Sequence, residues 1–198
     1  MAMNKSNSYY YIKEKISESI NVKNSLFGKM DYILDISEKI VECYEKGKKL
    51  LIFGNGGSAA DSQHIAGELV GRFKIDRNPL AAIALTTDSS IMTAWANDKH
   101  FDHVFSRQVE ALANPGDTLL GISTSGNSPN VINAFAKGKI IGTYNISLTG
   151  EDGGKLKELS DICLDVASKD TPRIQEAHGL IYHIVCDLVE KKIFGGNQ

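Results

Sequence analysis

The fold of this 198-residue chain is decided by the stretch Lys48–Ser58, KKLLIFGNGGS. Its first half is a short apolar run, which is typical of a central strand in a parallel sheet covered on both faces. Its second half is a glycine-rich turn, and apolar residues then return at helical spacing from about Ala59 to Phe73. The stretch therefore predicts a buried strand, a tight turn and a helix, the repeating unit of an α/β fold.

Similar units follow along the chain. The further predicted strands are 81–85, 117–122, 144–148 and 161–166. Helical sequence separates them, and a long final helix is predicted from about Pro172 to Ile193. The helix after Pro129 is expected to end early, because Gly138 costs about 1 kcal/mol relative to alanine in a helix. The pattern predicts a single α/β domain with a parallel sheet flanked by helices.

Two amphipathic helices are predicted before the first strand. Ile12, Ile16 and Ile20 recur every four residues, and apolar residues continue at helical spacing from Met30 to Tyr44. We therefore divide the chain into an N-terminal helical arm, residues 1–47, and a main domain, residues 48–198. The arm is expected to pack on the domain or between subunits, since its second apolar stripe is too large to leave in water.

Composition excludes several functions. A net charge of −2 without a basic patch gives no reason to expect nucleic acid or an anionic membrane as partner. No apolar run approaches the roughly 18 residues of a membrane span. The cysteines are odd in number and have neither metal-ligand nor redox spacing, which predicts a reducing compartment, the cytoplasm. They are Cys43, Cys163 and Cys186.

The segment Ser123–Ser128, STSGNS, is the most informative about ligands. Four hydroxyl side chains follow a predicted strand here: Ser123, Thr124, Ser125 and Ser128. Ser128-Pro129 is typical of a helix N-cap followed by proline at the first helical position. Hydroxyls, free amides and the positive helix end would then meet at one point, which favours a phosphate monoester. The alternative is a flexible turn with an ordinary cap.

The first glycine loop, Asn55–Ser58, is less specific. Its paired glycines let the backbone approach a ligand closely, but they equally suit a tight strand-to-helix turn. It matches neither the dinucleotide-binding fingerprint nor the P-loop, because no GxGxxG begins at Gly54 and no lysine follows Ser58. This argues against an enzyme that uses a nicotinamide or ATP.

A histidine and a carboxylate share one face of the next helix. His64 and Glu68 are four residues apart, so together they could ligate a divalent metal or carry out acid/base chemistry. Alternatively they form a solvated pair. The final helix also carries polar groups, which are compatible with core or interface filling: Gln175, Glu176, His178 and His183.

Four segments together resemble the phosphoheptose isomerases, a family with the sugar isomerase (SIS) domain. They are Gly54–His64, Ile83–Asp88, Gly121–Ser128 and Thr171–Glu176, and the resemblance spans about residues 48–189. The resemblance implies a five-stranded parallel sheet, a homotetramer, and conversion of sedoheptulose 7-phosphate to D-glycero-D-manno-heptose 7-phosphate. That reaction is an early step toward ADP-heptose and the heptoses of lipopolysaccharide or capsules.

The resemblance also implies a set of site residues. Substrate contacts fall on Asn55, Gly56, Gly57, Ser58, Glu68, Asn97, Asp98, Ser123, Thr124, Ser125, Ser128 and Gln175. One zinc per subunit is implied at His64, Glu68, Gln175 and His183. Glu68 is the preferred base and His183 handles the oxygen-side proton, although the two roles could be reversed. Glu68 is expected to face the space of the phosphate loop. Trp95 and His100, which flank Asn97 and Asp98, depart from the family and change the expected pocket shape.

Two other functions stay open at this point. A relative of these isomerases is a tetrameric adaptor that binds the bacterial replication initiator, and it keeps much of the same motif set. The ligand residues therefore do not exclude a non-catalytic adaptor. A sugar-phosphate sensor is less favoured, because the chain carries no DNA-binding module with a basic helix. The isomerase is the preferred interpretation.

Overall fold

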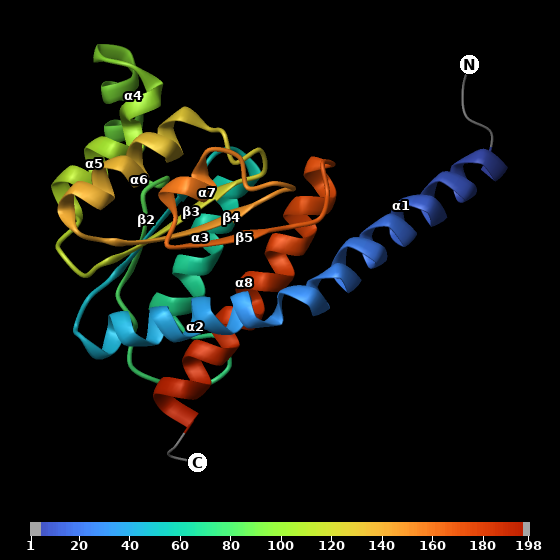
Figure 1. The fold of residues 1–198 in the computed structure, drawn as a ribbon, viewed down its shortest axis with the longest axis horizontal. Helices are drawn as coiled ribbons and strands as arrows, with labels where there is room; N and C mark the ends of the chain where they lie inside the picture. Colours follow the sequence, from blue (N-terminus) through green and yellow to red (C-terminus); the bar gives the residue numbers. More distant parts are fainter. Residues whose placement is uncertain (1–4, 196–198) are drawn as a thin grey trace.

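A computed structural model describes residues 5–195 (Figure 1). Its centre is one parallel sheet of five strands in the order β2-β1-β3-β4-β5. The strands are β1 (Leu50–Gly54), β2 (Ala82–Ala84), β3 (Thr118–Ser123), β4 (Tyr144–Thr149) and β5 (Ile162–Asp165). Each lies within two residues of its predicted ends. The expected five-stranded α/β fold is confirmed.

Helices cover both faces of the sheet. They are α1 (Lys5–Ser25), η1 (Leu26–Lys29), α2 (Met30–Glu45), α3 (Gly57–Val70), α4 (Ser89–Asp98), η2 (Phe101–His103), α5 (Val104–Leu112), α6 (Pro129–Ile141), α7 (Leu156–Leu159) and α8 (Thr171–Phe194). Side chains alternate between the faces along β1, which is buried throughout. Leu50 and Ile52 join the core under α2, α3 and α8, whereas Leu51 and Phe53 join the core under α5 and α6.

The strand order places the two predicted ligand loops beside each other. The chain leaves β1 toward β2 on one side, and β3 lies on the other side, so the direction of winding changes between β1 and β3. Ligands of open α/β sheets bind beyond the carboxyl ends of the strands at such a point. The loop after β1 opens α3, and the loop after β3 opens α6.

Two predicted helix ends are wrong. Helix α6 runs through Gly138 to Ile141 instead of ending early. A Cβ at Gly138 would lie 2.5 Å from Leu119 Cδ1, so glycine there allows the helix to pack closely on β3. Helix α3 ends at Val70 rather than Phe73, because the chain then turns back across α8 toward β2.

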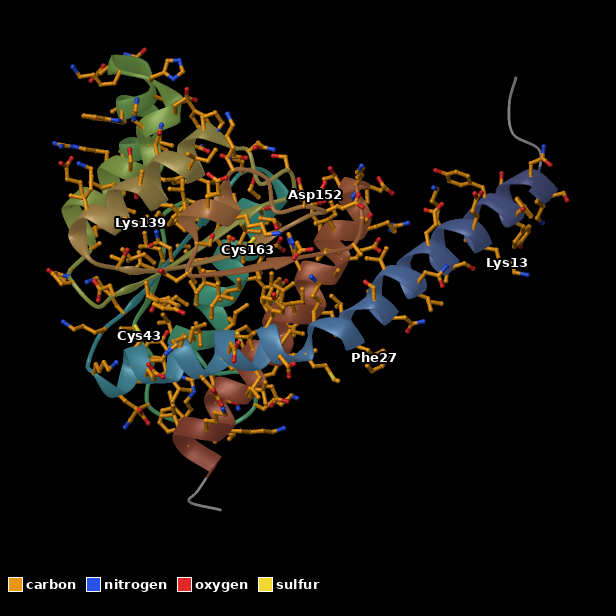
Figure 2. All side chains as sticks on the ribbon, viewed as in Figure 1. Lys13, Phe27, Cys43, Lys139, Asp152 and Cys163 are labelled. Atoms are coloured by element: carbon orange, nitrogen blue, oxygen red, sulfur yellow. The ribbon has the colours of Figure 1, made fainter. Side chains whose placement is uncertain are left out.

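The two helices of the arm are buried to different extents. Most of the inner apolar positions of α2, including Ile36 and Ile40, pack into the core of the same chain, while a role of the arm between subunits stays a prediction. Helix α1 projects from the body and buries no residue (Figure 1). Its Ile16 is 56% exposed, and Phe27, at the base of the arm, is 71% exposed (Figure 2).

The described helices include none that is both long and apolar enough to cross a membrane. The two predicted units, 1–47 and 48–198, each have one end outside the described residues, namely 1–4 and 196–198.

Candidate active site

The hydroxyl loop after β3 is folded around its own side chains. The Ser123 and Ser128 hydroxyls lie 2.9 Å apart, and the Ser123 and Ser125 hydroxyls 3.5 Å apart. Ser128 occupies the N-cap position of α6 and Pro129 follows in its first turn, as predicted, but the Ser128 side chain does not cap the helix. Its hydroxyl turns toward Ser123 instead. The start of α6 and three hydroxyls therefore face one place, a geometry suited to a phosphate.

The glycine loop after β1 is tied to this hydroxyl loop. The side-chain amides of Asn55 and Asn130 hydrogen bond to each other at the start of α6. Gly56 has a φ of 56°, which glycine adopts without strain. A Cβ at Gly57 would collide with the side-chain amide of Gln175, which therefore lies directly against this loop. The loop thus brings Gln175 next to the predicted substrate contacts.

A second cluster lies farther along α3 and α8. His64 Nε2 lies 3.1 Å from Glu68 Oε1, and one ligand atom each from His64, Glu68 and His183 lie within 4.8 Å of one another. The imidazole rings of His64 and His183 are 5.0 Å apart. Two imidazoles and one carboxylate are a set that zinc accepts, with a position left for water or substrate. The cluster fits the metal that was predicted.

Aromatic side chains that the sequence did not single out support these histidines. The Tyr182 hydroxyl lies 3.1 Å from His64 Nδ1, and burial together with the nearby Asp61 carboxylate raises the pKa of Tyr182 to about 12. The ring of Phe73 stacks on His183 at 5.9 Å and 23°. Neither residue stands in a pattern that local sequence could flag, because both act through the packing of α8.

The two halves of the site are separated within one chain. Glu68 follows Gly57 by eleven residues, which is about 16 Å along α3, and Gln175 precedes His183 by about 12 Å along α8. Gln175 lies against Gly57, so the structure brings together three of the four predicted metal ligands. Within one chain Glu68 thus lies near the opposite end of α3 from the ligand loops, and the expectation that it faces the phosphate loop stays a prediction.

Two more predicted contacts, Asn97 and Asp98, lie on α4, at the edge of the molecule (Figure 1). Asn97 donates to Asp98 Oδ1 at 3.0 Å, and both residues are exposed. The Arg107 guanidinium lies over the ring of Trp95, with its central carbon 4.8 Å from the centre of that ring. His100 turns toward Asp102, and its Nδ1 accepts a hydrogen bond of 3.2 Å from the backbone amide of Asp102. The two departures from the family thus have partners of their own beside Asn97 and Asp98.

Comparison with known proteins decides the family. The model of the SIS domain family matches residues 17–150. The phosphoheptose isomerase of Sulfurimonas denitrificans is 50% identical over 188 residues, covering 93% of this chain and 96% of the relative. That of Pelobacter propionicus is 59% identical over 160 residues, covering 81% and 85%. The chain belongs to the phosphoheptose isomerase family.

Solved structures of phosphoheptose isomerases agree. The enzyme from Neisseria gonorrhoeae superimposes with a TM-score of 0.88 at 43% sequence identity, and the match covers 92% of this chain and 98% of that enzyme. The enzyme from Francisella tularensis has a TM-score of 0.87 at 37% identity, with 96% and 100% covered. The expected family, SIS fold and enzyme class, an aldose-ketose isomerase, are confirmed. The described arm and domain together span almost the whole length of these phosphoheptose isomerases.

Proposed function

We propose that this chain converts sedoheptulose 7-phosphate into D-glycero-D-manno-heptose 7-phosphate. The observation that carries the proposal is the His64, Glu68 and His183 cluster, in a chain whose hydroxyl loop is built for a phosphate. The family supports the substrate, and a cluster of bases and acids supports the reaction type.

The reaction moves two protons. A base takes a proton from C1 of the ketose, and the electron pair of that C–H bond forms the C1–C2 double bond of an enediol while the C2 oxygen is protonated. The proton then returns to C2 and the O1 proton leaves, which yields the aldehyde at C1. We assign Glu68 as the base at carbon and His183 as the group that moves the oxygen-side protons.

Different residues are proposed to bind the metal and the substrate. His64, Glu68 and His183 would hold a zinc ion, one per subunit, and when bound it supplies polarisation of the substrate carbonyl. A carboxylate that ligates a metal is a weaker base, so any test of Glu68 has to measure metal content as well. Substrate binding is assigned to the loops after β1 and β3, with Gln175, Asn97 and Asp98.

We further propose that the complete site forms between subunits of a homotetramer. In one chain the two ligand loops meet at the start of α3 and the metal cluster involves its last turns, so a second copy would supply the missing half. Gln175 would then reach the metal from the neighbouring subunit. Residues 1–47 would form the unit that joins subunits, since α1 and Phe27 leave apolar surface uncovered, and 48–198 the SIS domain.

Two experiments test this. Purified protein is incubated with sedoheptulose 7-phosphate while aldose formation is followed; absence of turnover would contradict the isomerase and favour the adaptor of the replication initiator. Ser125→Ala subunits, assayed at a substrate concentration too low to saturate them, and Glu68→Gln subunits are then mixed after partial denaturation. Recovered activity supports a shared site, whereas a monomer by light scattering would contradict it. We place the enzyme in the cytoplasm, in keeping with its three free cysteines.

A further inference from the structure

An ion pair with almost no exposure joins the loop after α3 to the last turns of α8. Arg77 Nε lies 3.0 Å from Glu190 Oε1, and the two side chains are 2% and 1% exposed. A buried pair of this kind seldom adds stability over apolar residues of the same size, because both charges lose their water. The role of the pair therefore lies in the backbone groups that its two side chains bind.

Glu190 fixes the first part of the loop. Its carboxylate accepts hydrogen bonds from three consecutive backbone amides, those of Phe73 at 3.1 Å, Lys74 at 2.7 Å and Ile75 at 2.9 Å. Burial would raise the pKa of Glu190, but these amides and Arg77 outweigh it and hold the pKa below its usual value. The loop backbone is thus bound to α8 directly beside the stacked ring of Phe73.

Arg77 fixes the end of α3. Its guanidinium donates to the backbone carbonyls of Glu68 at 2.9 Å and Leu69 at 2.8 Å, in the last turn of the helix, where carbonyls lack partners within the helix. The Leu69 carbonyl also accepts from the Leu80 amide at 3.0 Å. A planar fork with several donors can bind both carbonyls while also pairing with a carboxylate, and a lysine cannot. The backbone that carries Glu68 is thereby held against the loop.

Each residue of the pair is connected by contacts to one residue of the metal cluster. From Glu190 the path runs through the Phe73 backbone to its ring, which stacks on His183. From Arg77 it runs to the carbonyl of Glu68. Glu68 and His183 belong to different helices, so their spacing depends on what ties α3 to α8 at this level.

We infer that the Arg77–Glu190 ion pair is a positioning device that sets the spacing of Glu68 and His183, an inference that rests on the proposed function. Arg77, Glu190 and Phe73 are positioning residues, since none of them reaches into the cluster with a reactive atom. Partners that orient metal ligands change metal affinity by about 10–100-fold when they are removed.

The test compares this pair with an exposed one that joins the same loop to the same helix. Lys74 Nζ lies 3.1 Å from Asp187 Oδ2, with the side chains 60% and 22% exposed. Glu190→Gln and Arg77→Lys remove the buried geometry. Asp187→Asn and Lys191→Gln remove exposed pairs of Asp187, and Lys74 is left in place because its ammonium also lies over the Phe73 ring. Zinc affinity is measured by calorimetry on metal-stripped protein, and kcat and KM are measured with sedoheptulose 7-phosphate below each variant's unfolding temperature.

We expect Glu190→Gln and Arg77→Lys to lower both kcat and zinc affinity by about tenfold or more. KM should stay within about twofold, because the phosphate loop lies elsewhere, and the exposed-pair variants should match wild type since such pairs contribute little. Equal losses in both sets, or a rise in KM alone, would overturn the inference.

Two further variants keep the test decisive if a single substitution unfolds the protein. Arg77→Met with Glu190→Gln removes both charges, which buried pairs tolerate far better than the loss of one, and the glutamine keeps an oxygen for the loop amides. Phe73→Leu keeps the ion pair and removes the ring that stacks on His183. Both should lose zinc affinity, and retained affinity would overturn the inference. The zinc measurement needs no turnover, so it separates failure of this inference from failure of the proposed reaction.

Discussion

Asn55 and Asn130 exchange two hydrogen bonds of 2.9 Å, each side-chain amide donating to the carbonyl oxygen of the other. Asn55 belongs to the glycine loop after β1, and Asn130, which is 2% exposed, to the first turn of α6. The pair therefore fixes the loop that carries the predicted sugar contacts against the loop that carries the predicted phosphate contacts.

Asn130→Asp should weaken binding of sedoheptulose 7-phosphate. The new carboxylate cannot donate to Asn55, and it adds a negative charge beside the phosphate site. Loss of a buried hydrogen bond costs about 1–3 kcal/mol, so the dissociation constant should rise by about tenfold. Asn133→Asp is the control, because Asn133 lies on the same helix and donates to Asp102 O instead. Equal affinities in the two variants would contradict the role of the amide pair.

The hydroxyl loop, Ser123–Ser128, should contribute to binding of sedoheptulose 7-phosphate, measured as its dissociation constant. Ser123→Ala, Ser125→Ala and Ser128→Ala each remove a donor to a charged acceptor, and each should cost about 1–3 kcal/mol of binding free energy. Ser160→Ala is a matched control, since that hydroxyl donates to Ser147 Oγ at 2.7 Å, away from the loop. If all three loop variants bind as tightly as the control, the phosphate binds elsewhere.

Local sequence patterns were sufficient for the sheet and its ligand loops, whereas the full set His64, Glu68 and His183 was predicted only through the resemblance to the family. Apolar runs and glycine turns are local, so β1, β3 and the loops after them were predicted correctly. The end of α6 was not, because the reason for Gly138 is a contact with Leu119. The proximity of His183 to His64 depends on how α3 packs on α8, and Tyr182, Arg77 and Glu190 have no local pattern at all.

Tyr182→Phe should weaken zinc binding without unfolding the protein. It removes the hydroxyl that lies 3.1 Å from His64 Nδ1 and leaves the ring in place. Loss of such a ligand-orienting bond should lower metal affinity by about tenfold, measured by calorimetry on metal-stripped protein. Tyr44→Phe is the control, because its buried hydroxyl has no partner. A Tyr182 variant that binds zinc like wild type would show that His64 needs no support.

His178 should make stability depend on pH. Burial lowers the pKa of His178 to about 4 from 6.5, while its Nε2 lies 3.0 Å from Thr149 O. Between these values the unfolded state binds a proton that the folded state does not, so the free energy of unfolding falls as pH is lowered. Above pH 6.5 this contribution is constant.

The measurement is urea unfolding of wild type and His178→Gln from pH 4 to 8. Glutamine can keep a donor toward Thr149 O but does not titrate. The wild-type curve should be steeper by up to about 1.4 kcal/mol per pH unit below pH 6.5, and the two curves should run parallel above it. Parallel curves over the whole range would contradict a neutral buried His178.

The most direct test of the account is turnover of sedoheptulose 7-phosphate by wild type and by Glu68→Gln, with zinc content determined for both. Glutamine keeps the size of the side chain and removes the proton acceptor. A positioned base contributes about 10²–10⁴ in rate, so turnover should fall by at least about a hundredfold at equal zinc content. Equal turnover by the two proteins, or no turnover by wild type, would contradict the assignment of this site.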